Sequence, residues 1–310
     1  MKKNFNCGSS ETIRKAPKFS FNLFYKYGHA KHMPRIEESF LEWFIGFFEG
    51  DGSFSVDSNK NTKRRLYLTI SQKEKTIIEK IAYTFGFGYV YYFKKNDNLY
   101  WQWRISSKKG LEQITLLFFG NLVLAKRQTQ FLKWVKIGKS QGLFNYKFNT
   151  NLIWGSTVSL NNAWLSGFID AEGCFYANFS VKKLFGPNKI IKPKFYQSFS
   201  LKQTISNEND IKLFNYILLL FESNSKVYIC YPTNKTKYLS IQLSSQKSQK
   251  LLINYIFNYK LKTIKHISFL RWWRIYLLKT KKKELFISEN LSEKSIKKIK
   301  RLVKQINLHS

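Results

Sequence analysis

The chain has 310 residues, of which 44% are hydrophobic and 17% aromatic, so it can hold two domains with cores and is not a disordered basic tail. Its 53 lysines and arginines outnumber 19 acidic residues, and the formal charge of +34 favours a polyanionic partner such as nucleic acid. We expect neither a membrane partner nor a secretory signal, because no apolar run reaches the roughly 18 residues of a membrane span. Three distant cysteines exclude a CxxC metal site.

The predicted elements follow a regular order after a basic, irregular extension over residues 1–36. Residues 37–137 form the first repeat, in which alternation of polar and apolar residues marks the strands and longer amphipathic runs mark the helices. The predicted elements are a helix ending at Asp51, strands over 53–57 and 65–71, a helix after them, a hairpin of FGFGYVYYF and NLYWQWRIS around the turn KKNDN, and helices near 111–118 and 126–137.

The same order recurs after a linker at 138–160 that is rich in Gly, Ser, Asn and Thr. The segment FLEWFIGFFEGDGSF from Phe40 returns as NAWLSGFIDAEGCFY from Asn162. Two later segments, WRISSKKG with IQLSSQKS and KRQTQFLKW with IKHISFLRW, repeat at a constant offset of 138 residues. Residues 161–279 therefore form a second repeat. A basic helical tail over 280–310 could hold DNA backbone, but we prefer the interpretation that it is solvated.

The repeated motif combines small residues with a terminal acid. Gly46 and Gly50 are four residues apart, so another helix can approach this face closely. If the two motif helices pack about a pseudo-dyad, Asp51 and Glu172 converge, and a divalent cation such as Mg²⁺ would hold the two carboxylates together. The alternative is that the small residues only pack helices and the acids are solvated; two aligned copies favour the catalytic interpretation.

These residues carry a family resemblance, which covers about residues 37–279. FIGFFEGDG at 44–52 and LSGFIDAEG at 165–173 resemble the two signature motifs of single-chain LAGLIDADG homing endonucleases. The resemblance implies an α+β fold of two pseudo-symmetric αββαββα repeats, packed through the motif helices, each with a curved antiparallel DNA-binding sheet. It also implies a monomer that recognises a long asymmetric site on double-stranded DNA and hydrolyses one phosphodiester on each strand.

The same resemblance assigns the centre of the site. Asp51 and Glu172, with the backbone at Gly50 and Ala171, are expected to bind Mg²⁺, for which Mn²⁺ or Ca²⁺ could substitute. Other expected catalytic residues are polar or basic: Gln72 and Gln203 beside the scissile phosphates, Lys126 or Arg127 in the first half, and Lys262 or Lys265 in the second. The choice within each basic pair stays open, and ordinary strand polarity or phosphate clamping are the alternatives.

DNA contacts are expected on the polar face of each sheet, because alternation places Phe54, Val56, Leu66 and Leu68 on the opposite, core face. A solvated sheet face is the alternative for any single residue. The predicted contacts are Ser55, Asp57, Asn59, Lys63, Arg65, Tyr67, Thr69, Tyr91, Gln102 and Arg104 in the first half, and Tyr176, Asn178, Ser180, Tyr196, Ser198, Ser200, Tyr228, Ser240 and Gln242 in the second.

Two other functions compete with DNA cleavage. Relatives with this fold can act as maturases that bind host intron RNA and assist splicing, and a non-catalytic basic DNA-binding protein is a further alternative. Intact acids in both motifs favour the nuclease. The frequent use of Lys, Asn, Ile, Phe and Tyr suggests an AT-rich genome, so we expect an organellar location, the mitochondrion rather than the chloroplast.

Overall fold

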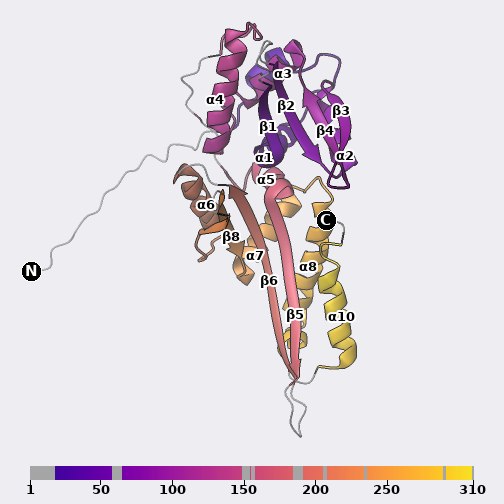
Figure 1. Ribbon diagram of the computed structural model, residues 1–310. Coiled ribbons are helices and arrows are strands. Elements are labelled where there is room, and N and C mark those ends of the chain that lie inside the picture. Colours follow the sequence, from indigo (N-terminus) through magenta and orange to yellow (C-terminus); the bar gives the residue numbers. More distant parts are fainter. Residues whose placement is uncertain are drawn as a thin grey trace, which may run out of the picture.

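The structure is a computed structural model that describes residues 18–57, 65–148, 154, 158–183, 191–204, 208–233, 236–288 and 291–308. It contains the two predicted repeats (Figure 1). In chain order the first half comprises the short π-helix η1 (Phe24–Gly28), α1 (Glu38–Asp51), β1 (Gly52–Asp57), β2 (Arg65–Gln72), α2 (Lys75–Phe85), β3 (Tyr89–Lys95), β4 (Asn98–Ile105), α3 (Lys108–Phe118) and α4 (Ala125–Ser140).

The second half repeats this order and then continues. It comprises α5 (Trp164–Glu172), β5 (Gly173–Lys183), β6 (Ile191–Thr204), α6 (Glu208–Leu220), β7 (Tyr228–Thr233), β8 (Thr236–Leu243), α7 (Gln246–Asn258), α8 (Lys265–Lys281), α9 (Glu284–Ile287) and α10 (Glu293–Lys304). The αββαββα order is therefore confirmed in both halves. Helix α4 continues slightly past the predicted start of the linker at residue 138. Gly138 lies within this helix, and its missing side chain leaves room for the ring of Phe144.

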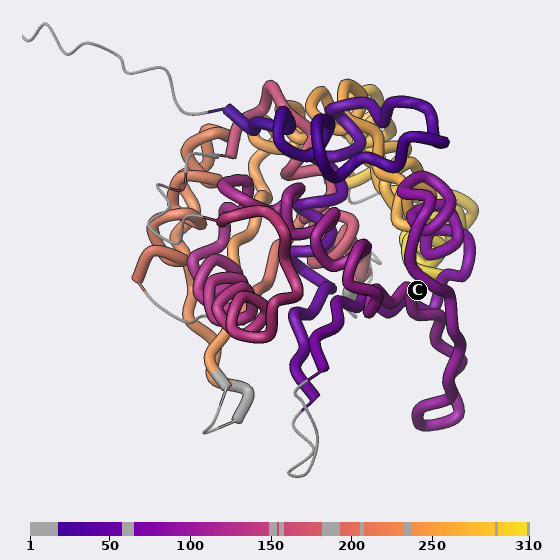
Figure 2. The backbone as a smooth tube through the Cα atoms, turned by 90° about the horizontal axis from the view of Figure 1, so that it is seen from above, coloured from indigo at the N-terminus to yellow at the C-terminus, as the bar shows by residue number. Residues whose placement is uncertain are grey.

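Each half holds a four-stranded antiparallel sheet, in the orders β1-β2-β4-β3 and β5-β6-β8-β7. The register pairs polar with polar and apolar with apolar residues: Ser55 lies opposite Tyr67, and Phe54 opposite Leu68. One face of each sheet is consequently polar, while the other packs on helices. Viewed as in Figure 2, the β1–β2 and β3–β4 hairpins project from the same side of the molecule.

The two halves meet through α1 and α5, which lie at the centre of Figure 1. Their backbones touch at two glycines. A Cβ atom on Gly46 would lie 1.9 Å from the Trp164 carbonyl oxygen, and one on Gly167 would lie 1.8 Å from the Trp43 carbonyl oxygen. Any side chain at these positions would separate the helices, so the small residues are what allow the halves to pack.

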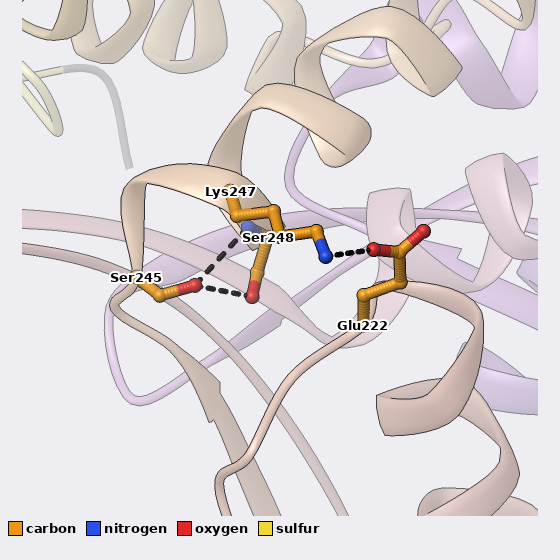
Figure 3. A network of polar contacts seen from close by, with 4 residues as sticks. All are labelled: Glu222, Ser245, Lys247 and Ser248. Carbon is orange, nitrogen blue, oxygen red and sulfur yellow. Dashed lines mark hydrogen bonds and ion pairs between the residues drawn. The ribbon is translucent and has the colours of Figure 1, made fainter.

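Serine side chains begin the equivalent helices α3 and α7. Ser107 Oγ accepts from the Gly110 backbone nitrogen at 3.2 Å, and Ser245 Oγ accepts from the Ser248 nitrogen at 3.1 Å. Such caps satisfy backbone donors that the first turn leaves free. Figure 3 shows the second cap together with the ion pair between Lys247 and Glu222, 2.5 Å from nitrogen to oxygen, which ties α7 to the turn after α6.

The described part of the N-terminal extension is not irregular, contrary to the prediction. Phe21, Phe24 and Ile36 are buried in the main core, and η1 packs on α3. The side chain of Gln113 donates to the Gly28 carbonyl oxygen at 2.7 Å. Aromatic residues in a basic segment were overlooked as a core signal: they bury apolar area, and this outweighs the local charge.

The C-terminal tail also packs, so the preferred interpretation of it as solvated is wrong. Phe286 and Ile299 are buried against Phe179 in a second apolar cluster beneath the long β5–β6 pair. Helix α10 runs beside β5 in Figure 1, and the Asn307 side chain donates to the Phe175 carbonyl oxygen at 3.0 Å. Amphipathic periodicity explains the packing, since one face of α10 is apolar while its lysines remain exposed. No helix within the described residues has the length and apolarity to cross a membrane.

Candidate active site

The two motif acids lie together at the ends of the central helices. Asp51 is the last residue of α1 and Glu172 the last of α5. The helices still touch at this end, because a Cβ on Gly50 would lie 2.3 Å from the Ala171 Cβ and 3.2 Å from the Glu172 Cγ. The predicted convergence of the acids follows from the repeated motif and the close packing of α1 on α5.

Both acids have raised pKa values. Burial raises the pKa of Asp51 to about 6, although the nearby charges of Lys265 and Arg127 and the amide of Gln72 lower it. Burial, and then the negative charge of Asp51, raise the pKa of Glu172 to about 7. Two carboxylates that disfavour each other's ionised form are the arrangement that a bound divalent cation would relieve.

Each acid accepts a hydrogen bond from one of the two glutamines that were predicted to lie beside the scissile phosphates. Gln72 Nε2 donates to Asp51 Oδ2 at 2.5 Å, and Gln203 Nε2 donates to Glu172 Oε1 at 3.0 Å. Gln72 is the last residue of β2 and Gln203 the next to last of β6, so antiparallel pairing with the strand that follows the motif brings each glutamine back to the acid. Each bond fixes the orientation of one carboxylate.

Two cations cap the carboxyl ends of the central helices. Arg127 donates through Nε to the Glu49 carbonyl and through Nη2 to the Gly50 carbonyl, at 2.8 and 2.9 Å. Lys265 Nζ donates to the carbonyls of Ile169 and Ala171, both at 3.1 Å. Positive groups at this pole interact favourably with the helix dipole and with the carbonyls of the last turn.

The other two basic candidates have different surroundings. Lys126 Nζ donates to Thr204 Oγ1 at 2.5 Å, on the Glu172 side of the centre. Lys262 Nζ instead lies 5.8 Å from the ring centroids of both Phe40 and Trp43, partway along α1. Of the two second-half alternatives, Lys265 is therefore the one at the helix ends, whereas the Lys262 backbone donates to Asp170 at 2.7 Å and its side chain lies along α1.

The first acid of each motif has a structural position that the sequence analysis missed. Glu49 is fully buried: Oε1 accepts from the backbone nitrogens of Val123 and Leu124 at 2.9 and 2.7 Å, and Oε2 accepts from Trp164 Nε1 at 2.6 Å. Burial raises its pKa to about 8. The repetition of an acid two positions before Asp51 and Glu172 was the available signal.

Asp170 makes the equivalent contacts from the other helix. Its Oδ2 accepts from Trp43 Nε1 at 2.8 Å, and its Oδ1 accepts from Thr263 Oγ1 at 2.5 Å. Each central helix thus carries an acid that binds a tryptophan of its partner helix. These reciprocal hydrogen bonds fix the relative position of α1 and α5, and with it the distance between the metal-binding candidates.

The donor set suits a hard divalent cation. Asp51 and Glu172 offer carboxylate oxygens, and no cluster of three or more His, Cys, Asp or Glu side chains that could hold a metal exists among the described residues. The remaining ligands would have to be carbonyls, water or substrate phosphate, which Mg²⁺ accepts. The carbonyls of Gly50 and Ala171 already accept from Arg127 and Lys265, although a carbonyl oxygen has a second lone pair.

The predicted DNA-contacting residues that the structure describes share one face of each sheet. Asn59 and Lys63 lie outside the described residues. Exposed members are Asp57, Arg65, Tyr91, Tyr176, Asn178, Ser180, Tyr196 and Tyr228, and half-buried members are Ser55, Tyr67, Gln102, Arg104, Ser200, Ser240 and Gln242.

Two of the predicted contacts are buried instead. Ser198 is 1% exposed and accepts from Gln242 Nε2 at 3.0 Å, and Thr69 is 8% exposed between neighbouring strands. Neither residue therefore exposes enough surface to contact DNA directly. Conversely, the exposed Lys194 and Lys202 belong to the same face, opposite Ser180 and Ser240, and were missed although alternation from Tyr196 predicts them.

A cavity of about 610 Å³ opens beside the acids, between the two halves. It is lined by Asp51, Gln72 and Lys73 from the first half and by Cys174 and Lys265 from the second. Asp51 therefore lies at a cavity that residues of both halves border.

Comparison with known proteins agrees with this geometry. The model of a family described as LAGLIDADG endonuclease matches the chain twice, at residues 44–138 and 165–276. The chain is 30% identical over 254 residues to a Neurospora crassa protein named probable intron-encoded endonuclease 4, which covers 80% of this chain but 42% of that protein's length. It is 28% identical over 202 residues, 61% of this chain and 29% of the other, to a Saccharomyces cerevisiae protein named intron-encoded RNA maturase bI4.

Solved structures show the same fold. The meganuclease I-SmaMI bound to uncleaveable DNA superposes with a TM-score of 0.64, at 18% identity, over 87% of this chain and 99% of that one. The meganuclease I-CpaMI bound to uncleaved DNA gives a TM-score of 0.63, also at 18% identity, over 86% and 99%.

Proposed function

Because this chain belongs to the LAGLIDADG endonuclease family, we propose that it is a site-specific endonuclease that cuts both strands of double-stranded DNA. The observation that carries the proposal is the convergence of Asp51 and Glu172, each held by a glutamine, at the junction of two polar sheet faces. Two acids related by a pseudo-dyad suit two phosphodiesters on opposite strands. The dependence on Mg²⁺ and the binding to a long asymmetric site are parts of this proposal.

The side chains around the acids would divide the chemistry. Asp51 and Glu172 would hold the divalent cation, which supplies water activation and stabilises the leaving oxygen when bound. Gln72 and Gln203 orient the carboxylates and can order water at the scissile phosphates. Arg127 and Lys265 cap the helix ends and keep positive charge close to where phosphate charge develops.

The two sheets would bind DNA through their polar faces. A chain with formal charge +34 binds phosphate strongly, and planar or hydroxyl side chains at alternating positions can reach base edges in the major groove. Because one chain supplies both halves, the protein would act as a monomer on an asymmetric site. The names of its relatives suggest that it is encoded in an organellar intron and acts in that organelle, the mitochondrion being favoured.

The test is cleavage of a plasmid library that carries candidate intron insertion sites, with Mg²⁺ or with EDTA. We expect one site to be cut on both strands with Mg²⁺ and no cutting with EDTA. Asp51→Asn and Glu172→Gln should each abolish double-strand cleavage while DNA binding in Ca²⁺ persists. Tight DNA binding without any cleavage by the wild type would contradict the nuclease.

A maturase is the second candidate, supported by the similarity to the Saccharomyces protein named an RNA maturase. The same preparation should be tested for binding to the RNA of the intron at whose insertion site it cuts. Tighter binding to that RNA than to any DNA site, with splicing assistance that survives Asp51→Asn, would favour this function over cleavage.

A further inference from the structure

Hydrogen bonds fix which positions of the two halves are equivalent near the acids. Trp134 Nε1 on α4 donates to the Ser55 carbonyl, and Trp272 Nε1 on α8 donates to the Tyr176 carbonyl, both at 3.2 Å. These tryptophans are 138 residues apart, like the capping residues Arg127 and Lys265. The residue before Arg127 is a lysine, whereas the residue before Lys265 is Ile264, so the second half lacks this ammonium group.

The ends of the second strands show the opposite difference. Gln72 and Gln203 both donate to a motif acid, so they are equivalent, and so are the residues that follow them. The residue after Gln72 is Lys73, and the residue after Gln203 is Thr204. At this position the first half has the lysine and the second half has the uncharged residue.

On the Glu172 side the two positions are in contact across the halves. Lys126 Nζ donates to Thr204 Oγ1 at 2.5 Å, and the same hydroxyl donates to Gln203 Oε1 at 3.0 Å. Gln203 Nε2 in turn donates to Glu172 at 3.0 Å. One ammonium group is thereby connected to this acid through two intervening side chains.

On the Asp51 side the equivalent positions, Ile264 and Lys73, also face each other. Here the lysine follows the strand, and the uncharged residue precedes the helix. Ile264 and Lys73 line the same cavity as Asp51, and the Ile264 backbone nitrogen donates to the adjacent Glu74 side chain at 2.7 Å. Ile264 has no charge to offer. Lys73 is exposed at this cavity, with its Nζ 5.8 Å from the ring centroid of Tyr100.

Beside each acid, two facing positions therefore contain one lysine between them. On the Glu172 side this lysine is Lys126 of α4, and on the Asp51 side it is Lys73, the residue directly after β2. Resting on the proposed nuclease function, we propose that Lys73 is the counterpart of Lys126, and that each lysine stabilises the phosphate of one strand during cleavage. Lys73 and Lys126 then control the cutting of opposite strands. A single ammonium in each pair avoids the repulsion that two adjacent lysines would create.

The experiment measures the cutting of each strand separately. The DNA is the site cut by the wild type, with the two 5′ ends carrying different fluorophores, under single turnover in Mg²⁺. Lys73→Thr should slow one strand on the order of 10²-fold, and Lys126→Ile should slow the other strand by a similar factor. Both changes copy the residue found at the equivalent position. Lys108→Thr, which removes an exposed lysine at the start of α3, is the matched control and should leave both rates unchanged.

Transfer of the lysine provides a rescue that a structural role would not give. Lys73→Thr combined with Ile264→Lys rebuilds on the Asp51 side the arrangement seen on the Glu172 side. We expect the slowed strand to recover to within about tenfold of the wild-type rate. DNA affinity in Ca²⁺ should change by less than about threefold in the single variants, since one phosphate contact of many is removed.

Several outcomes would overturn the inference while leaving the nuclease intact. These are equal slowing of both strands by either single variant, slowing of the same strand by both variants, loss of affinity large enough to explain the lost rate, or a folded double variant that shows no rescue. Absence of cleavage by the wild type itself would instead overturn the proposed function, and this inference with it.

Discussion

Within the described residues, β1 and β2 are paired as far as Asp57 and Arg65, whereas in the second half β5 and β6 are paired as far as Lys183 and Ile191. The longer pair is supported by α9 and α10, which have no equivalent among the described residues of the first half. Close to the pseudo-dyad the halves instead agree almost residue by residue. Residues near the pseudo-dyad contact the equivalent residues of the other half, as Gly50 contacts Ala171, so a change in one half requires a change in the other. Strands far from the pseudo-dyad have no such contacts and can differ between the halves.

Near the pseudo-dyad, the two halves share contacts more closely than they share residue types. Glu49 and Asp170 both accept from a tryptophan of the partner helix, although their side chains differ in length. The shorter Asp170 reaches a backbone nitrogen and a threonine hydroxyl, whereas Glu49 reaches two backbone nitrogens. The comparison teaches that the two halves share the position of the carboxyl group, and that the adjoining loop differs with the length of the side chain.

The largest expected effect comes from the contact that both halves share. Gly46→Val and Gly167→Val should each lower the free energy of unfolding by about 3 kcal/mol or more, because their side chains would overlap backbone atoms of the partner helix. Urea unfolding measures the loss. As a control, a side chain at Gly120 meets nothing within 4 Å, so Gly120→Ala should cost about 1 kcal/mol from its positive φ alone. Equal losses in all three variants would contradict close packing at the dyad.

A smaller effect should distinguish the two buried acids. Trp164→Phe removes the donor to Glu49 Oε2 and should cost about 2 kcal/mol, since a buried acceptor is left unpaired. Trp43→Phe should cost about 1 kcal/mol, because Asp170 Oδ2 keeps the Lys262 backbone nitrogen as a donor. Both values come from denaturant unfolding of the metal-free protein. The reverse order would show that hydrogen bonding does not set the difference.

The support for the long hairpin can be removed locally. Ile299→Ala should weaken the packing of α10 by about 2 kcal/mol and speed hydrogen exchange in the part of β5–β6 beyond Phe179. Exchange in β1–β2 should stay the same. Lys297→Ala, on the exposed face of the same helix, is the matched control. Faster exchange in both hairpins would mean that the tail stabilises the whole protein rather than one half.

The smallest effect is a dependence of stability on pH. The pKa values of Asp51 and Glu172 are raised to about 6 and about 7, so between about pH 4 and pH 7 the folded state holds protons that the unfolded state has lost. In EDTA the free energy of unfolding should therefore fall as pH rises through this range. Because both groups are partly exposed, the share of Glu172 should be about 1 kcal/mol.

Unfolding at pH 5 and pH 8 checks this prediction. Glu172→Gln should flatten the decline, and Mg²⁺ should raise the stability of the wild type at pH 8 but not of the variant. A decline that is identical in wild type and variant would assign it to the remaining acids with raised pKa values, Asp51, Glu49 and Asp170.

Much of the site could be predicted because it lies in the repeated segments. The position of Gln72 and Gln203 beside the acids follows from strand pairing after the motif, and the polar face of each sheet follows from alternation. The choice between Lys262 and Lys265 stayed open because two basic residues three positions apart look alike in sequence. Only the backbone hydrogen bond to Asp170 shows which of them turns toward the centre.

Burial could not be predicted in the same way. Thr69 and Ser198 have the right alternation for the polar face, but both are buried in the folded chain. Phe21 and Phe24, in a basic segment without periodicity, join the core because α3 offers them an apolar surface. In both cases the deciding atoms come from parts of the chain far away in sequence.

The sequence by itself determined the two repeats, the order of elements in each and the residues that end the central helices, since these depend on local periodicity and on a motif that occurs twice. The tertiary structure decided which lysine faces which acid, which polar strand residues are covered, and that the two ends of the chain pack on the core. Those properties depend on side chains that meet only after folding, and a +34 chain offers many basic candidates for each position.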